Sequence, residues 1–266
     1  MTSLRRLGVP SLRRLGVIVA HELRLAWRDP SSILVLLVFP IITTAFLKPA
    51  FRPALVESGF THANGAEQVV PGQAVMSAFF IVSLVTFSFF AEHGWATWDR
   101  LRASRATSFE IVAGKSLPRV AIGIAQLGLL LGAGVLVFGL HIRGSAVALA
   151  PLIVAFSLCL VLLGVCVTAV CRTAQQANAF AYLGMVLFGA IGGAFVPFSV
   201  LPAWARAVAP VTPTYWAMRG MRSVILGGQG LGGIALPAAA LLAMTGVFAL
   251  VALRRMRFDE RKAGWA

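Results

Sequence analysis

The side chains that could carry chemistry are few in this sequence of 266 residues, which holds nine Asp and Glu, four His and three Cys. Glu92 and His93 are neighbours, and an acid beside a histidine could act in acid–base chemistry or contribute to a metal site. Adjacent residues of a helix point in different directions, so a shared site would need ligands from elsewhere. We therefore favour a solvated helix end or a packing contact for this pair.

Gly114-Lys115-Ser116 has the residue types that end a nucleotide-binding P-loop. That loop also needs a glycine five residues earlier, so that backbone N–H groups can wrap a phosphate, and this position is Phe109. No strand is expected before it either. The chain is therefore not expected to bind a nucleotide or another cofactor, and any ATP must be handled by another polypeptide. The three cysteines have no CxxC spacing and are interpreted as small core residues.

The composition shows what kind of element must position these few groups. Hydrophobic residues make up 59% of the chain, charged residues 12%, and the mean hydropathy is +0.87. Such a surface is suited to lipid rather than to water. The net charge of +14 would suggest nucleic acid in a soluble protein, but here Lys and Arg collect in short segments between apolar runs. That distribution is typical of the cytoplasmic flanks of membrane spans, and we exclude nucleic acid as a partner.

Six uncharged runs are long enough to cross a bilayer as helices. The sequence therefore predicts an all-α integral membrane protein with a transmembrane domain over residues 31–253. No short apolar core with a small-residue cleavage site follows the Arg-rich N-terminus, so the first span is expected to direct insertion. The expected spans are 31–50, 70–91, 119–140, 147–170, 177–196 and 233–253.

The distribution of positive charge predicts the orientation of these spans. With the N-terminus inside, seventeen of the 23 Lys and Arg lie on the cytoplasmic side and six on the outer side. This bias satisfies the positive-inside rule, and six spans return the C-terminal tail, residues 254–266, to the cytoplasm.

Residues 11–28, within a cytoplasmic N-terminal segment 1–30, have the pattern of an amphipathic helix that lies in the headgroup plane. Apolar side chains fall on one face and basic side chains, toward anionic lipid, on the other. Glu22 falls near the apolar face, where it either pairs with an Arg of another segment or snorkels to water. The residues singled out on this helix are Glu22, Arg24, Trp27 and Arg28.

The longest expected cytoplasmic connection, residues 92–118, is predicted to be structured. Thr107 and Glu110 have capping-box spacing, which begins a short helix through Ile111 and Val112. Gly114 and Pro118 are expected to end that helix before the third span.

Residues 197–232 are too apolar for an ordinary loop and too rich in proline for one helix. They are expected to re-enter the membrane as two half-helices that meet near Pro210. Pro202 and Pro213 would be first helical residues, with Ser199 and Thr212 as caps. The aromatic residues Trp204, Tyr215 and Trp216 would anchor the hairpin at the outer interface.

Two glycine pairs could bring helices close together: Gly128-xxx-Gly132 in the third span and Gly189-xxx-Gly193 in the fifth. Close packing within the chain is the favoured interpretation, and a dimer face is the alternative.

Three stretches of this sequence resemble the permease subunit of an ABC type-2 exporter. The first, His21 to Pro30, is similar to the interfacial connecting helix of that family. The second, Glu92 to Lys115 followed by Ser116-Leu117-Pro118, resembles the segment that holds the coupling helix, although Gly94-Trp95-Ala96-Thr97-Trp98 departs from the commoner Gly-Thr pattern. The third runs from Gly192 to Trp216 and Arg219 and resembles the re-entrant region. The order of these stretches on six spans is most similar to antibiotic-resistance permeases of the daunorubicin type.

The resemblance implies a bacterial inner-membrane exporter of amphipathic, drug-like or lipid-like molecules. Two permease chains, identical or related, would sit on two cytosolic ATPases that bind ATP and Mg. This chain would contact lipid and would have no enzyme activity of its own. Its surface contacts with the ATPases are expected from Arg100, Arg102, Arg105, Glu110 and Lys115. Further residues of interest in the re-entrant region are Pro202, Trp204, Pro213, Tyr215, Trp216 and Arg219.

Two other functions are compatible with the sequence. An intramembrane enzyme would depend on Glu92, His93 and Glu22, whereas a structural or assembly factor would need no such group. The polar residues inside the spans are mild, which favours an amphipathic solute over a small ion.

Overall fold

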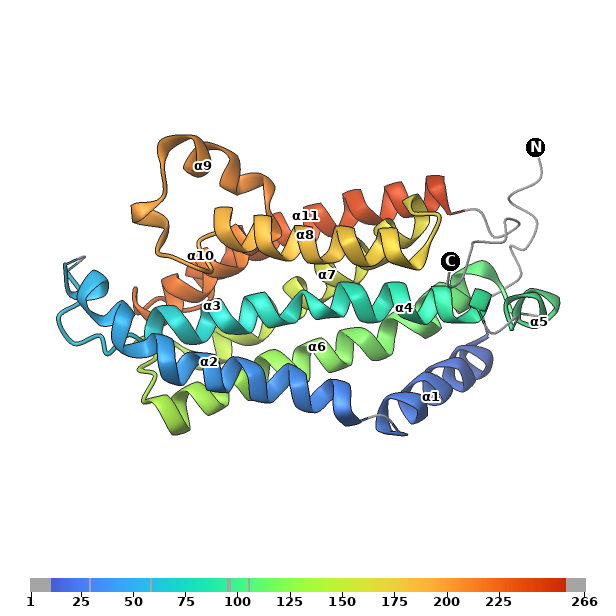
Figure 1. The fold of residues 1–266 in the computed structure, drawn as a ribbon, viewed down its shortest axis with the longest axis horizontal. Helices are drawn as coiled ribbons and strands as arrows, with labels where there is room; N and C mark the ends of the chain where they lie inside the picture. Colours follow the sequence, from blue (N-terminus) through green and yellow to red (C-terminus); the bar gives the residue numbers. More distant parts are fainter. Residues whose placement is uncertain (1–10, 29, 58, 95–96, 105, 257–266) are drawn as a thin grey trace.

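The computed structural model describes residues 11–28, 30–57, 59–94, 97–104 and 106–256, and within them it contains helices and no strand (Figure 1). The all-α prediction is confirmed. The α-helices are α1 (Leu12–Arg28), α2 (Pro30–Glu57), α3 (Ala66–Ala78), α4 (Phe80–Gly94), α5 (Trp98–Ala103), α6 (Ser108–Phe138), α7 (Leu149–Val170), α8 (Ala174–Ile191), α9 (Ala203–Val208), α10 (Pro213–Ile225) and α11 (Leu231–Arg255). Three 3-10 turns are η1 (Ala146–Ala148), η2 (Phe198–Val200) and η3 (Ala209–Val211).

The long helices lie side by side in an elongated bundle with two distinct ends (Figure 1). We call one the α1 end; it carries α1, α5 and the last turn of α11, at the right of the figure. The other is the α9 end, which carries α9, α10 and the segment 139–148. The first described helix and the end of the last one therefore share one end, as an even number of spans requires.

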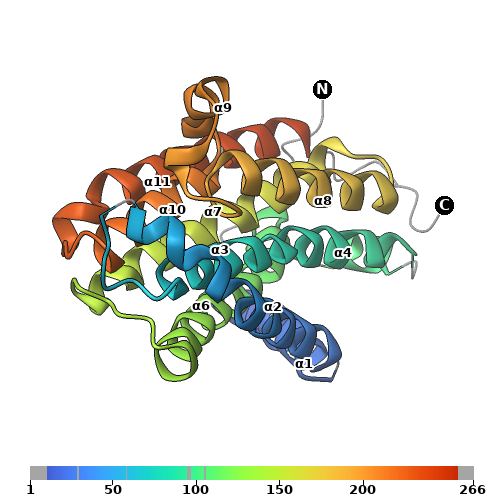
Figure 2. The same cartoon turned by 60° about the vertical axis from the view of Figure 1, so that its left-hand side comes forward.

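Five stretches of the described residues are long and apolar enough to cross a membrane. They are Leu36–Glu57, Ala66–Glu92, Ser108–Phe138, Ala146–Val170 and Leu231–Arg255. The expected fifth span falls on α8, whose first turns contain the amides Gln175, Gln176 and Asn178 and are less apolar. Its 18 residues lie alongside α4 in the bundle (Figures 1 and 2).

Helix α7 forms the centre of the bundle because it packs against α11, α4, α6 and α10. Phe156, Cys159 and Leu160 on this helix are fully buried, and no cysteine of the described chain forms a disulfide. The outward faces of α8 and α11 remain apolar, as expected of surfaces that meet lipid.

The expected second span is one apolar stretch in two helices, because α3 and α4 are separated at Phe79. The Phe79 N–H donates to the carbonyl of Met76, and the Val82 N–H donates to that of Phe79, both with the tighter three-residue spacing. Phe79 itself is buried against Phe188 of α8 in an edge-to-face contact, with 6.1 Å between the ring centroids.

Helix α6 corrects one prediction. The capping box of Thr107 and Glu110 is present, but Gly114 and Pro118 do not end a short helix; α6 continues from Ser108 to Phe138. One proline removes a single N–H from the helix ladder, and packing on both sides of α6 maintains the helix across it. The coupling segment is therefore continuous with the third span.

The far end of α6 is capped by groups from other elements. The Lys48 ammonium donates to the carbonyl oxygen of Phe138 at 2.7 Å, and the Asn64 side-chain amide donates to Phe138 and Gly139. Gly139 has φ +64°, a left-handed conformation that favours glycine. Cation and amide thus satisfy the orphan carbonyls at this helix end.

The segment after α8 has the broken helical form that its prolines predict. Thr212 caps α10 by accepting from the Tyr215 N–H, and Pro213 is the first helical residue. Pro202 is in the N-cap position of α9 rather than its first turn, and Ser199 lies in η2, so that part of the prediction is wrong. Re-entry of this segment into the membrane stays a prediction.

The glycine pairs behave differently from each other. A Cβ on Gly189 would lie 2.0 Å from the Met76 sulfur, so this glycine permits close contact between α8 and α3. Gly128 and Gly132 have no neighbouring atom within 4 Å of such a Cβ, and the prediction of close packing there is wrong.

Candidate functional site

A group of buried charges lies at the α1 end, where α1, α4 and α6 meet. The Lys115 ammonium donates to Glu22 Oε1 at 2.7 Å, to Glu92 Oε1 at 2.8 Å and to the carbonyl oxygen of Ser88 at 3.1 Å. Its side chain is 3% exposed, and that of Glu22 is 4% exposed. The three donors of the ammonium thus bind three acceptors on two other helices.

Arg119 completes the group from the next turn of α6. Its Nη1 lies 2.7 Å from Glu22 Oε2 and forms an ion pair with that carboxylate. We refer to Glu22, Glu92, Lys115 and Arg119 as the charge cluster. Two acids and two bases make it neutral, which is the condition under which charges remain stable in a low-dielectric interior.

Glu92 is further held by the segment that leads to α5. The Thr97 hydroxyl donates to Glu92 Oε2, and the Thr97 N–H donates to the Glu92 carbonyl oxygen at 3.0 Å. The start of the expected coupling helix is therefore hydrogen-bonded to a member of the charge cluster.

A second polar contact joins the beginnings of α1 and α6. Glu110 is fully buried and accepts from the Ser11 N–H at 2.6 Å and from the Arg14 guanidinium at 3.0 Å through Oε1. Its Oε2 accepts from the Thr107 N–H at 2.7 Å. One carboxylate thus binds the N-terminal amides of two helices, where the helix dipoles favour negative charge.

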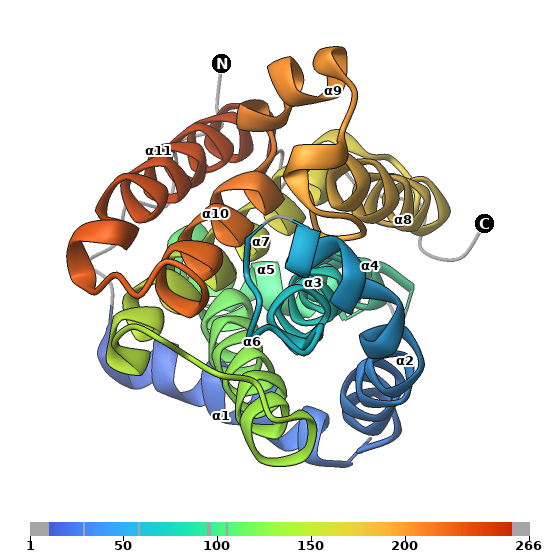
Figure 3. The same cartoon turned by 90° about the vertical axis from the view of Figure 1, so that its left-hand side faces the viewer.

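Between these two polar contacts, α1 and α6 approach closely at Gly114. A Cβ at this position would lie 2.5 Å from Ile18 Cγ2, closer than any side chain permits. Gly114 therefore provides space for α1 and does not end the helix. In Figure 3, which looks along the bundle, α1 runs across the view beneath α6, whereas α3 and α8 point toward the viewer.

The structure changes the expectation for the ATPase contacts. Glu110 and Lys115 are buried and bonded within the chain, so the prediction that they are surface contacts is wrong. Arg105 and the side chains of Arg100 and Arg102 lie outside the described residues, and their role stays a prediction.

The position of Glu22 in the interfacial helix decides between the two expectations for this side chain, an ion pair with an arginine or exposure to water. This side chain turns inward and pairs with an arginine of another segment, Arg119, rather than snorkelling. Arg24 and Arg28 are exposed, and the side chain of Trp27 lies outside the described residues. No local pattern identifies this partner of Glu22, because Arg119 is 97 positions away.

At the α9 end, three of the residues expected in the re-entrant region form one cluster. Arg219 lies over the Trp216 ring, with 5.5 Å from Cζ to the ring centroid, and its Nη1 donates to the Tyr215 hydroxyl at 3.3 Å. Pro202 and Trp204 are exposed, and Pro213 is buried at the start of α10.

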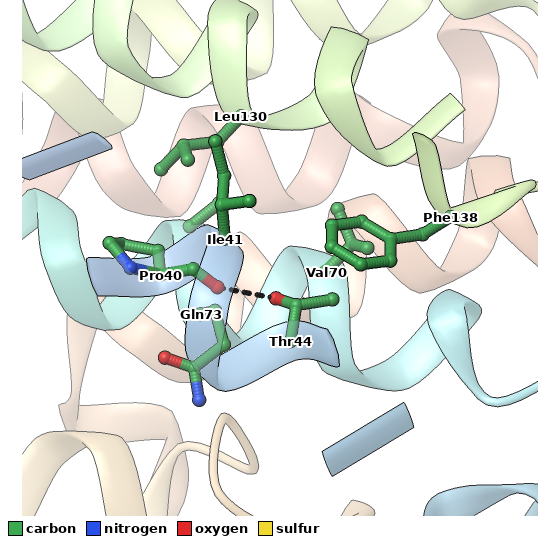
Figure 4. Close-up of a pocket in the computed structure, with 8 residues that line it drawn as sticks. Pro40, Ile41, Thr44, Val70, Gln73, Leu130 and Phe138 are labelled. Atoms are coloured by element: carbon green, nitrogen blue, oxygen red, sulfur yellow. Dashed lines mark hydrogen bonds between the residues drawn. The ribbon is translucent and has the colours of Figure 1, made fainter. Parts of the chain in front are cut away.

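A small pocket lies between α2, α3 and α6 (Figure 4). Its volume of about 10 Å³ is close to the space that one water molecule needs, whereas pockets for drug-sized ligands measure roughly 300 Å³ or more. The Thr44 hydroxyl donates back to the Pro40 carbonyl in its wall. This pocket is too small to hold an exported molecule.

The geometry offers little to the enzyme alternative. Glu92 is bonded to Lys115 and Thr97, and the side chain of His93 lies outside the described residues. Across the part of the chain that the structure describes, no three His, Cys, Asp or Glu residues come together as metal ligands.

Sequence reasoning missed Arg119, which it counted only as cytoplasmic positive charge. It also missed the internal role of Lys115, which it predicted to be a surface contact with the ATPases. One signal was present. Lys115 and Arg119 are four residues apart, so on a continuous helix they share one face, and Glu22 and Glu92 were the nearby acids without an assigned partner.

Comparison with known proteins gives a consistent result. The sequence profile of the ABC-2 type transporter family matches residues 13–226. A segment of 159 residues is 32% identical to the linearmycin resistance permease protein LnrN of Bacillus subtilis, covering 58% of this chain and 41% of that protein. A segment of 146 residues is 27% identical to the probable multidrug ABC transporter permease YbhR of Escherichia coli K12, covering 54% of this chain and 40% of that protein. The matched region thus spans about two fifths of the length of these relatives.

Proposed function

This chain belongs to the ABC-2 type transporter family and is a multi-pass membrane protein, and from that premise we propose that it is the permease subunit of an ATP-driven exporter. Two cytosolic ATPase subunits bind and hydrolyse ATP with Mg. A second permease chain, identical or related, completes the membrane part. The assembly lies in the bacterial inner membrane with both termini of this chain in the cytoplasm.

The observation that carries the proposal is the buried charge cluster at the α1 end. It links the interfacial helix α1 to two apolar helices, α4 and α6, beside the segment where the resemblance places the ATPase contact. An ion pair without solvent resists separation, because each charge would be left buried and unpaired. A force applied to α1 or to the α4–α5 connection is therefore transmitted to the spans.

Two polar contacts hold α1 to α6 at different points along its length. Glu110 binds the beginning of α1, and Glu22 is bound two to three turns later, with Ile18 packed on Gly114 between them. Helix α1 is thus held to α6 at three levels and moves with it as one body. Movement of α6 then changes the packing around α7, against which it lies.

We infer the substrate class from the apolar spans and from the relatives. The spans expose apolar surface, and the two relatives are named for linearmycin resistance and multidrug transport. We propose an amphipathic, drug-like or lipid-like molecule that moves out of the cytoplasm.

The test uses this chain co-expressed with the ATPase encoded beside its gene. We expect the ATPase to co-purify, and vesicles that contain both proteins to accumulate an amphipathic substrate when ATP is supplied outside inside-out vesicles. Recovery of the chain in the native membrane without any ATPase subunit would contradict the proposal.

A charge-balanced variant separates coupling from folding. Glu92→Gln with Lys115→Met leaves the Glu22–Arg119 ion pair in place and keeps the cluster neutral. We expect the ATPase to bind and hydrolyse ATP while transport falls at least tenfold. Arg254→Gln, an exposed basic residue at the same end, is the matched control and retains transport. Equal transport by the two variants would show that the cluster has no part in coupling.

A further inference from the structure

We propose that Arg219 and Arg222 of α10 form a binding site for the phosphate of an anionic phospholipid headgroup at the α9 end of the bundle. The inference does not depend on the ATPase partner. It rests on the geometry of one helix face and on the charges around it.

Helix α10 is fixed in place on its inner side. Its buried residues include Thr214, Ala217, Met218 and Met221, and they pack on α7, α11, α3 and α8. The Thr214 hydroxyl donates to the Phe188 carbonyl at the end of α8, and Gly192 leaves the space for it. The opposite face of α10 therefore points away from the bundle with little freedom to rotate.

On that face, two aromatic rings support the Arg219 guanidinium. Trp216 is held because its indole N–H donates to the Pro210 carbonyl at 2.8 Å, and Tyr215 packs on Phe198 with 5.2 Å between ring centroids. Arg219 stacks on Trp216 and uses one N–H for the Tyr215 hydroxyl. Its remaining donors are presented as a planar edge, the geometry that binds phosphate through two parallel hydrogen bonds.

Arg222 lies one turn further along the same face and is half-buried. In the part of the chain that the structure describes, neither guanidinium pairs with a carboxylate. Glu67, an acid at this end, is buried and already accepts from the N–H groups of Asn64 and Gly65. Two like charges three residues apart repel each other, and a shared anion would remove that repulsion.

The surroundings favour a lipid as the source of that anion. Tyr215, Trp216 and the exposed Trp204 are the residue types that settle at headgroup level in membranes. An arginine near an anionic bilayer surface contributes roughly a fivefold gain in affinity. Two arginines at this depth would therefore select phosphatidylglycerol over phosphatidylcholine.

The test measures thermal stability of the full chain in a neutral detergent as phosphatidylglycerol is added, since a ligand of the folded state raises the melting temperature. We expect a saturable rise for the natural protein. In the Arg219→Gln/Arg222→Gln variant the lipid concentration at half-saturation should increase by about 30-fold. The variant without lipid should melt as the natural protein does, because Arg219 is exposed and Arg222 only half-buried.

The matched control is Arg143→Gln/Arg206→Gln, which removes two exposed arginines at the same end. We expect it to keep the half-saturation point within twofold. An equal loss of lipid affinity in both double variants would show that binding depends on the general positive charge of this end rather than on one site, and would overturn the proposal. A rise with inorganic phosphate as large as the rise with phosphatidylglycerol would assign the pair to free anions and overturn the lipid assignment. Absence of any saturable rise would overturn the site itself.

Discussion

At the scale of single residues, Lys115 is the side chain whose role changed most. Its sequence context suggests a remnant of a P-loop or a surface charge, yet it is almost fully buried with three acceptors around its ammonium. Burial of a charge is tolerable only where partners of opposite sign surround it. Lys115 therefore links helices structurally, and its contribution to stability depends on both Glu22 and Glu92.

Lys115→Met should lower the stability of the chain, because it leaves two buried carboxylates with one remaining base. Breaking a buried pair costs about 3 to 5 kcal/mol, which corresponds to a melting temperature lower by about 10 °C. The measurement is the temperature at which the purified chain loses its monodisperse elution in detergent.

The double variant Glu92→Gln/Lys115→Met removes the carboxylate that the single variant leaves without a base and keeps the Glu22–Arg119 ion pair, so it should melt above the single Lys115→Met variant. If the double variant melts at a lower temperature than the single one, the account of Lys115 as a neutralising partner is wrong.

At the scale of elements, the contact of α1 with α6 is set by a glycine. Gly114 allows Ile18 to approach the α6 backbone, and polar contacts at Glu110 and Glu22 fix the helices on either side of it. The pattern of α1 alone predicts an amphipathic helix on a membrane surface. It does not predict which side of that helix meets protein.

Gly114→Ala should separate α1 from α6 and cost about 1 to 3 kcal/mol, because the added methyl group overlaps Ile18. Thermal unfolding measures this change. Gly128→Ala is a control on the same helix, where nothing lies within 4 Å, and it should stabilise α6 by about 0.5 to 1 kcal/mol. Equal effects of the two substitutions would exclude close contact at Gly114.

At the scale of the whole molecule, ion pairs hold the helices together at one end of the bundle, and helix caps and aromatic contacts hold them at the other. The α1 end holds the charge cluster, and the α9 end holds the capped terminus of α6 and the edge-to-face rings of Tyr215 and Trp216 on α10. The positive-inside rule predicts that the α1 end lies in the cytoplasm.

Cysteine labelling tests this orientation. In a variant whose three native cysteines are alanine, a cysteine at Arg24 or Arg254 should be protected from a membrane-impermeant maleimide in intact cells. A cysteine at His62 or Arg206 should react, since these residues are exposed at the α9 end. Labelling in the opposite pattern would reverse the proposed topology.

Sequence alone was enough to predict the fold class, the amphipathic α1, the capping box at Thr107 and the capped start of α10. These features depend on periodicity, on hydrophobic length and on hydrogen bonds between residues three or four apart, all of which are local. The helix breaks were predicted less well. A proline or glycine ends a helix only where packing from neighbouring elements does not support the backbone.

The pairing of the buried charges depends on the packing of the helices. Glu22, Glu92, Lys115 and Arg119 are separated by up to 97 positions, and their pairing depends on how α1 and α4 pack against α6. Partners that are distant in sequence offset the free energy cost of burying each charge, and a local sequence pattern does not identify such partners. The charged groups that this protein buries are therefore identified by contacts between helices and not by a motif within one helix.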